Sequence, residues 1–454
     1  MSGPYAGHTV LVAGAGISGA AAAEVLQRLG AKVVVTDRNE SARTEALSAG
    51  GATFAAALTA VPAAVDLVVT SPGWRPDHPL LSSAARAGVE VIGEVELAWR
   101  VRGAFGRPPA PWLAVTGTNG KTTTVEMLAA MLRAGGLRAL AAGNIGRPLV
   151  QAVADSEPHE ALAVELSSFQ LHWSSSLAPA AAAILNVAPD HLDWHGSMEN
   201  YAADKARVLA PGTLAVYNVD DTWSVRLTAA ADRRVGFTLA EPADGQLGLV
   251  GSELVDRALG HGPFADAGDL ALGQHNIANA LAAAALAFSQ QVSADAVRSA
   301  LGAFRPGRHR NEVVGTLDGV MYVNDSKATN AHAAAASVSS YDRIVWIAGG
   351  LLKGATVDDL VVAAAPRLAG VVLLGVDRAE IAAALARHAP NVPVVEVART
   401  DDGAMIDVLS HARRMAGRGD VVLLAPAAAS MDMFTDYAAR GEAFVRAARA
   451  LGVA

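Results

Sequence analysis

Short apolar runs alternate with longer segments of helical periodicity along the first hundred residues of the chain. The runs are rich in valine and end at glycine or polar residues, as strands do, whereas the longer segments repeat their apolar positions as helices do. The expected strands cover residues 8–13, 32–36, 66–70 and 89–92. Strands that alternate with helices predict a parallel sheet with helical crossovers.

Two loop-forming breaks divide this alternation. Residues 106–111 (GRPPAP) are rich in proline, and residues 305–310 (RPGRHR) are basic. Clusters of proline and glycine interrupt regular structure, and a length of 454 residues itself predicts about three domains. We therefore expect an α/β protein whose three domains cover residues 1–106, 107–306 and 307–454.

The elements expected after the first break continue the alternation. A strand at residues 112–115 leads into a helix that ends near residue 133, and two apolar runs at 161–164 and 184–187 have the character of strands. In the third domain, strands are expected at 319–323, 343–348, 371–374, 392–397 and 421–424, followed by a helix at 432–451.

Composition narrows the classes of protein that this chain can be. Hydrophobic residues make up 52%, enough for several buried cores, which excludes general disorder. The formal net charge of −8 argues against a protein that holds nucleic acid by neutralising its phosphates. The absence of cysteine excludes disulfides, thiolate metal sites and cysteine nucleophiles. No lysine or arginine precedes Arg28, and no apolar run approaches the ~20 residues that span a bilayer, so we expect a cytoplasmic protein without membrane insertion.

A glycine-rich turn stands between the first expected strand and the first helix. Gly14-Ala15-Gly16-Ile17-Ser18-Gly19 has the GxGxxG pattern, whose glycines permit a tight turn and let a phosphate approach the helix N-terminus. Asp37 ends the next strand, where a dinucleotide fold has its ribose acceptor. Ser71-Pro72-Gly73 follows the third strand at the same edge. These residues leave open an NAD(P) site, a site for another nucleotide diphosphate such as a UDP-sugar, or a packing turn without ligand.

The strongest chemical signal is a second loop, Gly117-Thr118-Asn119-Gly120-Lys121-Thr122, between a strand and a helix. It has two fewer residues between its glycines than the Walker pattern, but it keeps the functional groups. In such loops backbone N–H groups surround the phosphates, the lysine reaches the β- and γ-oxygens, and the hydroxyl binds Mg²⁺. The loop therefore predicts ATP or GTP binding.

Candidate metal ligands follow two apolar runs of the same domain. Glu165 ends the run at 161–164, and His191 follows the run at 184–187. Both stand beyond expected strand ends, where ligands bind in open α/β sheets. Taken singly, Glu165 is also compatible with a surface carboxylate, His191 with a loop histidine and Lys205 with a solvated helix residue.

Taken together, the motifs resemble the Mur ligases in order and spacing over nearly the whole chain. The matching stretches are the two glycine-rich loops, Ser71-Pro72-Gly73, GNIG at 143–146, ELSSFQ at 165–170, HLD at 191–193, GQHN at 273–276, His309-Arg310, NDSKATN at 324–330 and Ser430. The N-terminal GxGxxG and the NDSKATN string favour the branch of the family that adds glutamate. The resemblance implies a Rossmann-like UDP-binding domain, a central P-loop ATPase-like domain and a C-terminal Rossmann-like domain.

The resemblance also implies an ATP-dependent ligase that works through an acyl phosphate. It would join D-glutamate to UDP-N-acetylmuramoyl-L-alanine in the synthesis of peptidoglycan precursors. The UDP-sugar would be held by Gly14, Gly16, Ile17, Ser18, Gly19, Asp37, Arg38, Ser71, Pro72 and Gly73, with Asn144, Ser167 and Gln170 at the muramoyl portion. ATP would contact Gly117, Thr118, Asn119, Gly120, Lys121, Thr122, Thr123, Asn276, Asn279, Arg310 and Asp325.

Roles in catalysis and amino-acid binding follow from the same resemblance. The incoming glutamate would be surrounded by Lys327, Thr329, Lys353, Ser430 and Phe434. Two Mg²⁺ sites are expected, with Thr122 and Glu165 at one, His191 at the second, and Lys205 as a metal ligand if it is carbamylated. Lys121, His191 and Lys205 are thus the expected catalytic residues, and a monomer is the expected oligomeric state.

Three other interpretations of the residues stay open at this point. A nicotinamide-dependent oxidoreductase would use the first glycine-rich turn, but it leaves TGTNGKTTT and NDSKATN without a purpose. A non-catalytic nucleotide-binding protein would not need Glu165, His191 and Lys205 together. The nearer alternative is a ligase of the same family, or of the folylpolyglutamate synthase type, with another amino acid or acceptor.

Overall fold

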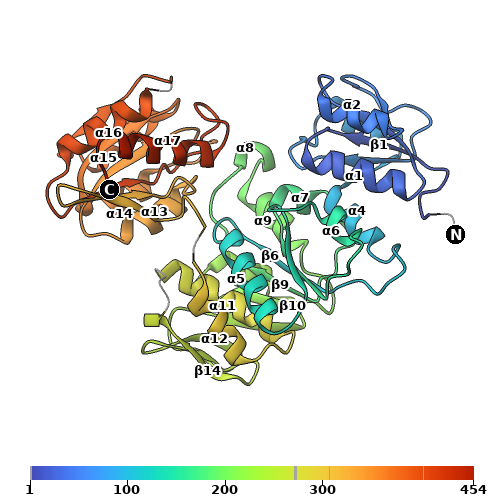
Figure 1. Ribbon diagram of the computed structural model, residues 1–454, viewed down its shortest axis with the longest axis horizontal. Coiled ribbons are helices and arrows are strands. Elements are labelled where there is room, and N and C mark those ends of the chain that lie inside the picture. The colour runs from blue at the N-terminus through green and yellow to red at the C-terminus, as the bar shows by residue number, and fades with distance from the viewer. Residues whose placement is uncertain (1–2, 270–273, 306, 402) are drawn as a thin grey trace. The chain divides into compact units, whose positions relative to one another are not determined.

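Three β-sheets organise the computed structural model, which describes residues 3–269, 274–305, 307–401 and 403–454 (Figure 1). Gly273 of the GQHN string lies outside the described residues. Within these ranges, strands and helices alternate in each of the three parts of the chain, so the expected α/β fold class is confirmed. No described helix is both long enough and apolar enough to cross a membrane.

The first sheet is wholly parallel and has the strand order β3-β2-β1-β4-β5. Its central strand is lined by Val10, Leu11 and Val12, which are completely buried. Because β1 lies between β2 and β4, the strand order reverses at its carboxyl end, where open sheets bind ligands. The elements are β1 (Thr9–Ala13), α1 (Ile17–Arg28), β2 (Lys32–Thr36), α2 (Ala42–Ala49), β3 (Thr53–Phe54), β4 (Leu67–Thr70), α3 (Pro79–Arg86), β5 (Glu90–Gly93) and α4 (Glu94–Val101).

The second sheet has the order β14-β13-β12-β11-β10-β9-β6-β8-β7, and only β13 pairs antiparallel with its neighbours. The elements are β6 (Trp112–Thr116), α5 (Lys121–Ala134), β7 (Ala139–Gly143), α6 (Leu149–Val153), β8 (Ala161–Glu165), α7 (Ser168–His172), β9 (Ala181–Ile184), α9 (Met198–Ala206), β10 (Leu214–Asn218), α10 (Thr222–Leu227), β11 (Arg233–Phe237), β12 (Gln246–Val250), β13 (Glu253–Asp256), β14 (Gly262–Asp266), η1 (Ala267–Asp269), α11 (Gln274–Phe288) and α12 (Ala294–Ala303).

Helices α5, α11 and α12 pack together beside this sheet (Figure 1). The alanines of α11 between Ala280 and Ala287 are completely buried, so this part of the helix lies in the core and not at its surface. The low aromatic content, 5% of residues, suits such packing because small side chains let helix backbones approach closely. This packing brings the start of α5 close to the first turns of α11.

The third sheet has the order β15-β16-β20-β17-β18-β19, with an antiparallel pair only at β15. Neighbouring residues of β17 face opposite sides: Trp346 belongs to one core cluster, and Val345 to the other. Helices therefore cover both faces. The elements are β15 (Glu312–Leu317), β16 (Val320–Asn324), α13 (Ala331–Ser339), β17 (Ile344–Gly349), α14 (Asp358–Ala364), η2 (Ala365–Arg367), β18 (Leu368–Leu374), α15 (Arg378–His388), β19 (Val394–Glu396), α16 (Ala404–Met415), β20 (Val421–Leu424) and α17 (Tyr437–Ala450).

The chain forms two compact units. The first contains residues 1–187 and 199–304, with the first two sheets, and the second contains residues 188–198 and 305–454, with the third sheet. The short segment 188–198, which carries α8 (Leu192–His195), thus belongs to the second unit although both of its neighbours in sequence belong to the first.

Two expected elements need correction. The strand expected at residues 184–187 is β9, which covers Ala181–Ile184 and pairs with β6 and β10. Its alanines carry no β-branched signal, so their burial between two strands could not be seen in the sequence. The helix expected at 432–451 begins only at Tyr437, because Asp436 accepts a hydrogen bond from the Ala439 amide (2.7 Å) and acts as its N-cap.

Candidate functional site

The glycine-rich turn after β1 is held by the ends of two neighbouring strands. Asp37 Oδ2 accepts a hydrogen bond from the Ala15 amide (2.7 Å), and Ser71 Oγ donates one to the Gly14 carbonyl oxygen (3.4 Å). Gly14 has a φ of 99°, and a Cβ at this position would lie 2.5 Å from Ser71 Oγ. The structure therefore brings the turn, Asp37 and Ser71 together at the switch point of the first sheet.

The other residues assigned to the UDP-sugar surround this turn. Ile17, at the start of α1, is 68% exposed, although it is apolar. Arg43, which the sequence did not single out, donates from its guanidinium to the Ala15 carbonyl oxygen (3.3 Å) and adds a cation beside the helix N-terminus. Such a combination suits a diphosphate. Gly16, Arg38 and Gly73 are exposed, Ser18 and Pro72 are half-buried, and Gly19 is buried.

The phosphate loop passes through two left-handed glycines. Gly117 has a φ of 152° and Gly120 a φ of 84°. A Cβ on Gly120 would lie 2.3 Å from Asn279 Oδ1, so the loop packs directly on α11. Helix α5 begins at Lys121, and the first-turn amides of a helix lack intrahelical acceptors and attract phosphate. Of the two hydroxyl residues that follow, Thr122 is half-buried and Thr123 is buried.

Two lysines converge on the carbonyl oxygen of Gly117. Lys121 Nζ donates to this oxygen (2.9 Å) and to that of Thr118 (2.8 Å), and Lys205 Nζ donates to it from α9 (2.8 Å). Lys205 is only 1% exposed. Two ammonium groups on one carbonyl oxygen place positive charge beside the loop, which favours an anion such as a triphosphate.

Tyr201 joins the same group, and the sequence analysis missed it. Its hydroxyl forms a hydrogen bond with Thr118 Oγ1 (3.1 Å), and its ring centroid lies 4.4 Å from the Lys205 ammonium. The available signal was its position four residues before Lys205, which places both side chains on one face of a helix. Tyr201 thus links the phosphate loop to the buried lysine.

The expected nucleotide asparagines lie side by side on α11. Asn279 Nδ2 donates to Asn276 Oδ1 (3.2 Å), and both residues are buried. Because a Cβ on Gly120 would lie 2.3 Å from Asn279 Oδ1, the structure brings this pair to the phosphate loop.

Glu165, at the end of β8, has one satisfied and one unsatisfied oxygen. Oε1 accepts a hydrogen bond from Asn144 Nδ2 (2.8 Å), whereas Oε2 is buried without a hydrogen-bond partner in the part of the chain that the structure describes. Glu165 itself is 2% exposed. An unpaired buried carboxylate oxygen is costly, and it is the kind of ligand that Mg²⁺ prefers. The residues present therefore fit a metal ion at this position, although no group of three His, Asp or Glu side chains suited to a metal occurs among the described residues.

Ser167 and Gln170 form a capping box at the start of α7. Ser167 Oγ accepts from the Gln170 amide (3.2 Å), and Gln170 Oε1 accepts from the Ser167 amide (3.0 Å). Each side chain therefore already satisfies part of the helix terminus. The nearby amide of Asn144 donates to the Glu165 carbonyl oxygen (2.9 Å), so these acceptor-binding candidates and Glu165 share one edge of the sheet.

His191 lies in the segment that belongs to the second unit, and it adopts a left-handed φ of 55°. The preceding residue, Asp190, contacts two residues of that unit. Its carboxylate lies 3.8 Å from Lys353 Nζ and accepts a hydrogen bond from Asn330 Nδ2 (3.3 Å). His191 is thus in a different unit from Glu165 and Lys205.

The glutamate-binding candidates stand on loops at the carboxyl edge of the third sheet. Lys327 Nζ lies 3.8 Å from the ring centroid of Tyr437, a residue that the sequence did not indicate. The Thr329 amide donates to the Lys327 carbonyl oxygen (2.8 Å). Ser430 is buried, and its carbonyl oxygen accepts a hydrogen bond from the Phe434 amide (2.9 Å). The Phe434 side chain packs against the core.

A buried arginine, Arg440, fastens three of these loops to α17. Its guanidinium donates to the Ser326 carbonyl oxygen (3.0 Å), to that of Ala428 (3.1 Å) and to that of Gly349 (3.3 Å). Arg440 is 1% exposed. Burial lowers its pKa to about 9, although the negative charge of Asp432 raises the pKa in part. Its position in a regular helix concealed this role in the sequence.

Arg310 and Asp325 belong to the second unit, whereas the phosphate loop belongs to the first. Burial raises the pKa of Asp325 to about 6, and a hydrogen bond from the Asn311 amide (3.2 Å) and the charge of Arg310 partly offset this. A carboxyl group in such surroundings is a candidate for binding a ligand hydroxyl or cation.

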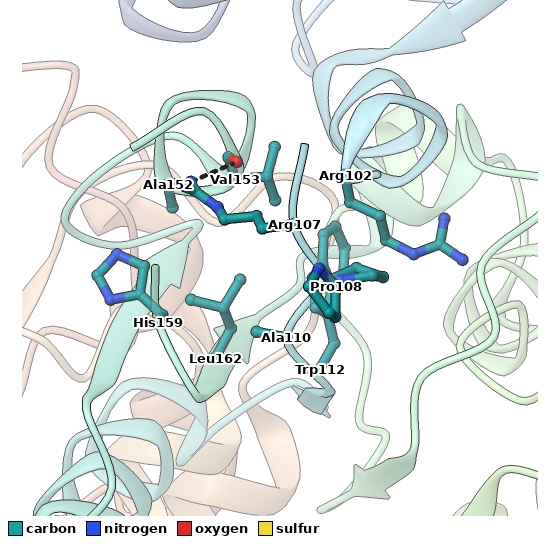
Figure 2. Close-up of a pocket in the computed structure, with 10 residues that line it drawn as sticks. Arg102, Arg107, Pro108, Ala110, Trp112, Ala152, Val153, His159 and Leu162 are labelled. Atoms are coloured by element: carbon teal, nitrogen blue, oxygen red, sulfur yellow. Dashed lines mark hydrogen bonds between the residues drawn. The ribbon is translucent and has the colours of Figure 1, made fainter. Parts of the chain in front are cut away.

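A small cavity of about 20 Å³ lies where the 107–112 linker meets α6 and β8 (Figure 2). Arg107, which lines it, donates to the Val153 carbonyl oxygen (3.3 Å) and so satisfies the end of α6. A cavity of this size holds about one water molecule. None of the residues assigned from the sequence lines it, so it is not the candidate active site.

Comparison with known protein domains assigns each part of the chain. Residues 8–93 match the domain described as "Mur ligase MurD-like, N-terminal domain", residues 115–287 match "Mur ligase middle domain", and residues 309–428 match "Mur ligase, glutamate ligase domain". The three matches follow one another in the order of the three sheets.

Full-length relatives and solved structures agree with this assignment. The chain is 55% identical over 100% of both chains to UDP-N-acetylmuramoylalanine–D-glutamate ligase of Streptomyces coelicolor, and 57% identical to the Thermobifida fusca protein of that name, over 98% of this chain and 99% of the relative. The fold matches that of UDP-N-acetylmuramate-alanine ligase from Thermotoga maritima with a TM-score of 0.60 at 20% identity, covering 98% of this chain and 99% of that one. With its three matching domains and its full-length relatives, the chain belongs to the Mur ligase family.

Proposed function

We propose that this chain is an ATP-dependent ligase that joins D-glutamate to UDP-N-acetylmuramoyl-L-alanine. The observation that carries the proposal is the phosphate loop with its two convergent lysines, in a chain 55% identical from end to end to a ligase of this name. Its product would be a peptidoglycan precursor.

The oxygen of a free carboxylate is a poor leaving group, so the acid must be activated before an amine can form an amide with it. ATP transfers its γ-phosphoryl group to the L-alanyl carboxylate, which gives an acyl phosphate and ADP. The glutamate amine attacks the acyl carbon, the bond from this carbon to the phosphate oxygen breaks, phosphate leaves with the electron pair, and the amine loses a proton. We assign Lys121 to the charge that develops on the transferred group, because its ammonium is already placed on the loop.

The metal ligands are assigned by the same reasoning. Glu165, with its unpaired oxygen, and Thr122 would hold one Mg²⁺ ion, and His191 would bind a second. Lys205 would be a metal ligand if it is carbamylated. Bound Mg²⁺ would offset the repulsion between triphosphate and carboxylate. The carbamate would convert the Lys205 cation into an anionic ligand.

Substrate contacts are proposed for each sheet edge. The UDP group would bind at the turn between Gly14 and Gly19, and the muramoyl portion near Asn144, Ser167 and Gln170. Glutamate, with two carboxylates, would bind among Lys327, Thr329, Lys353, Ser430 and Phe434, which offer cations and hydroxyl donors. Because ATP and nucleotide sugars are cytoplasmic metabolites, we propose that the enzyme acts in the cytoplasm. We also propose that it acts as a monomer.

A panel of acceptors and amino acids tests the proposal. Purified protein with Mg²⁺ and ATP is offered UDP-N-acetylmuramoyl-L-alanine, UDP-N-acetylmuramate or a folate, each with D-glutamate, L-glutamate or L-alanine. ADP release and the product mass are measured. We expect turnover only with UDP-N-acetylmuramoyl-L-alanine and D-glutamate; turnover with another pair instead would assign a sibling reaction.

Two variants of α5 make this assay specific for the phosphate loop. Lys121→Ala should abolish ADP formation while the protein stays folded. Arg133→Ala is the matched control, because Arg133 is exposed at the other end of the same helix and donates to the Ala139 carbonyl oxygen (3.4 Å), away from the loop. Near-normal turnover by Lys121→Ala would refute the assigned role.

A further inference from the structure

Asn186, just beyond the end of β9, holds the first half of the phosphate loop through three hydrogen bonds. Its carbonyl oxygen accepts from the Thr118 amide (2.9 Å), and its side-chain Oδ1 accepts from the Asn119 amide (2.9 Å). Its Nδ2 donates back to the Asn119 carbonyl oxygen (3.2 Å). One asparagine therefore pairs both the N–H and the C=O of Asn119, as a neighbouring β-strand would.

These bonds determine which loop amides can meet a phosphate. A backbone N–H is a single donor, and those of Thr118 and Asn119 are directed at Asn186. The phosphate contacts are then left to the amides from Gly120 onward, at the N-terminus of α5, and to Lys121. Gly117 fits the same packing, since a Cβ there would lie 3.2 Å from the Asn186 carbonyl oxygen.

Asn186 is itself well anchored. The preceding residue, Leu185, donates from its amide to the Thr116 carbonyl oxygen (3.0 Å), and its own carbonyl oxygen accepts from Asn218 Nδ2 (3.0 Å). The following residue, Val187, donates to Asp221 Oδ2 (3.2 Å). The loop is thus attached to a strand end that the sheet holds on both sides of Asn186.

We propose that Asn186 is a positioning residue for ATP, and this inference rests on the proposed function of the loop. By occupying the amides of Thr118 and Asn119, it gives the amides from Gly120 onward and Lys121 their orientation toward the β- and γ-phosphates. An aspartate could not replace it, because the carboxylate lacks the Nδ2 donor and brings a negative charge next to the phosphates.

Nucleotide binding by calorimetry tests this role without the ligation reaction. The protein is titrated with AMP, ADP and AMP-PNP in the presence of Mg²⁺, as wild type, Asn186→Ala and Asn186→Asp. We expect Asn186→Ala to bind ADP and AMP-PNP about tenfold more weakly, which corresponds to the loss of roughly one to two hydrogen bonds. Asn186→Asp should weaken the binding of these two nucleotides further. The binding of AMP should be unchanged in both variants. Equal weakening of all three nucleotides would overturn the proposal.

Asn218→Ala is the matched control. Asn218 bonds to the same strand end, at Leu185, but has no hydrogen bond to the loop. Binding by this variant should match that of the wild type, and the melting temperatures of all variants show whether each is folded. If Asn218→Ala weakens ADP binding as much as Asn186→Ala, the strand end in general, and not Asn186, is responsible.

The outcome also separates this inference from the proposed function. A wild-type protein that ligates, together with Asn186 variants that bind ADP normally, would overturn the role of Asn186 alone. A wild-type protein that binds AMP-PNP no better than AMP would contradict both. A phosphate-dependent loss in the variants would support Asn186 even if the acceptor proved to be a different one.

Discussion

Lys205 donates a hydrogen bond of 2.8 Å from its buried ammonium group to the carbonyl oxygen of Gly117 in the phosphate loop. Because Lys121 donates to the same oxygen (2.9 Å), two positive charges lie against one acceptor. Like charges that converge on one acceptor repel, and they do so more strongly away from water. Conversion of Lys205 to a carbamate would relieve this repulsion and supply an anionic oxygen beside the loop.

Replacement of Lys205 should separate the effect of charge from that of the carbamate. We expect both Lys205→Ala and Lys205→Arg to lose roughly a hundredfold or more in kcat. Alanine has no amino group to carbamylate, and arginine keeps the positive charge but cannot be carbamylated. Intact-mass measurement of the wild type should show one added CO₂, and short carboxylic acids should restore some activity to Lys205→Ala. Full activity of Lys205→Arg would rule out the carbamate.

The hydrogen bond between Tyr201 and Thr118 should contribute to turnover. Removal of either hydroxyl, by Tyr201→Phe or Thr118→Val, is expected to cost about 1 kcal/mol, or a several-fold loss in kcat/KM for ATP. The Tyr201→Phe variant keeps the aromatic ring over the Lys205 ammonium, so only the hydroxyl is tested. The double variant should lose little more than either single one, whereas additive losses would show that the two hydroxyls act independently.

Lys353 should affect the amino-acid substrate specifically. Its ammonium is 3.8 Å from the Asp190 carboxylate, a contact that a substrate carboxylate could replace. Lys353→Gln should therefore raise the KM for glutamate about tenfold or more and leave the KM for ATP unchanged. Lys32→Gln, at an exposed lysine of β2, serves as the control. An equal rise in both KM values would argue for a general structural effect.

Glu94 should make the stability of the first unit depend on pH. Burial raises the pKa of Glu94 to about 7, which backbone hydrogen bonds from Val150 and Leu149 only partly offset. Since this value is above that of the unfolded chain, the folded state binds the proton more tightly. The contribution of Glu94 is therefore present at acid pH and is lost as pH rises through about 7.

Glu94→Gln should remove this loss. Relative to the wild type, the variant is expected to gain about 2 kcal/mol in the free energy of unfolding between pH 5 and pH 8, measured by denaturant titration. Glu96→Gln is the control on the same helix. Burial raises the pKa of Glu96, but hydrogen bonds from Ser176, Ser175 and Arg100 outweigh this and lower it, so that variant should be most destabilised at high pH. A pH-independent difference for Glu94→Gln would contradict the prediction.

Much of the fold could be read from local patterns. Strands β2 and β20 were expected at their observed residues, and the two glycine-rich loops were recognised because a tight turn before a helix needs glycine at specific positions. The two errors have different causes. Three of the four residues of β9 are alanines, which carry no β-branched signal, and the start of α17 depends on an Asp436 cap within a helix-compatible segment.

The candidate site divides in the same way. Lys121 and Thr122 belong to one short motif, so their roles follow from their spacing. Asn186, Tyr201 and Arg440 were not found, because each acts on a loop far away in sequence. The separations are 67 residues for Asn186 and Asn119, 83 for Tyr201 and Thr118, and 114 for Arg440 and Ser326.

By itself, the amino-acid sequence determined the class of fold and the local chemistry of phosphate binding, because both depend on residues that are neighbours along the chain. Only the tertiary structure decided that two lysines meet on one carbonyl oxygen and that an asparagine occupies two loop amides. Those contacts depend on which strands are adjacent in the sheet. The order β10-β9-β6-β8 places segments from distant parts of the chain beside the loop after β6, and no local pattern encodes that order.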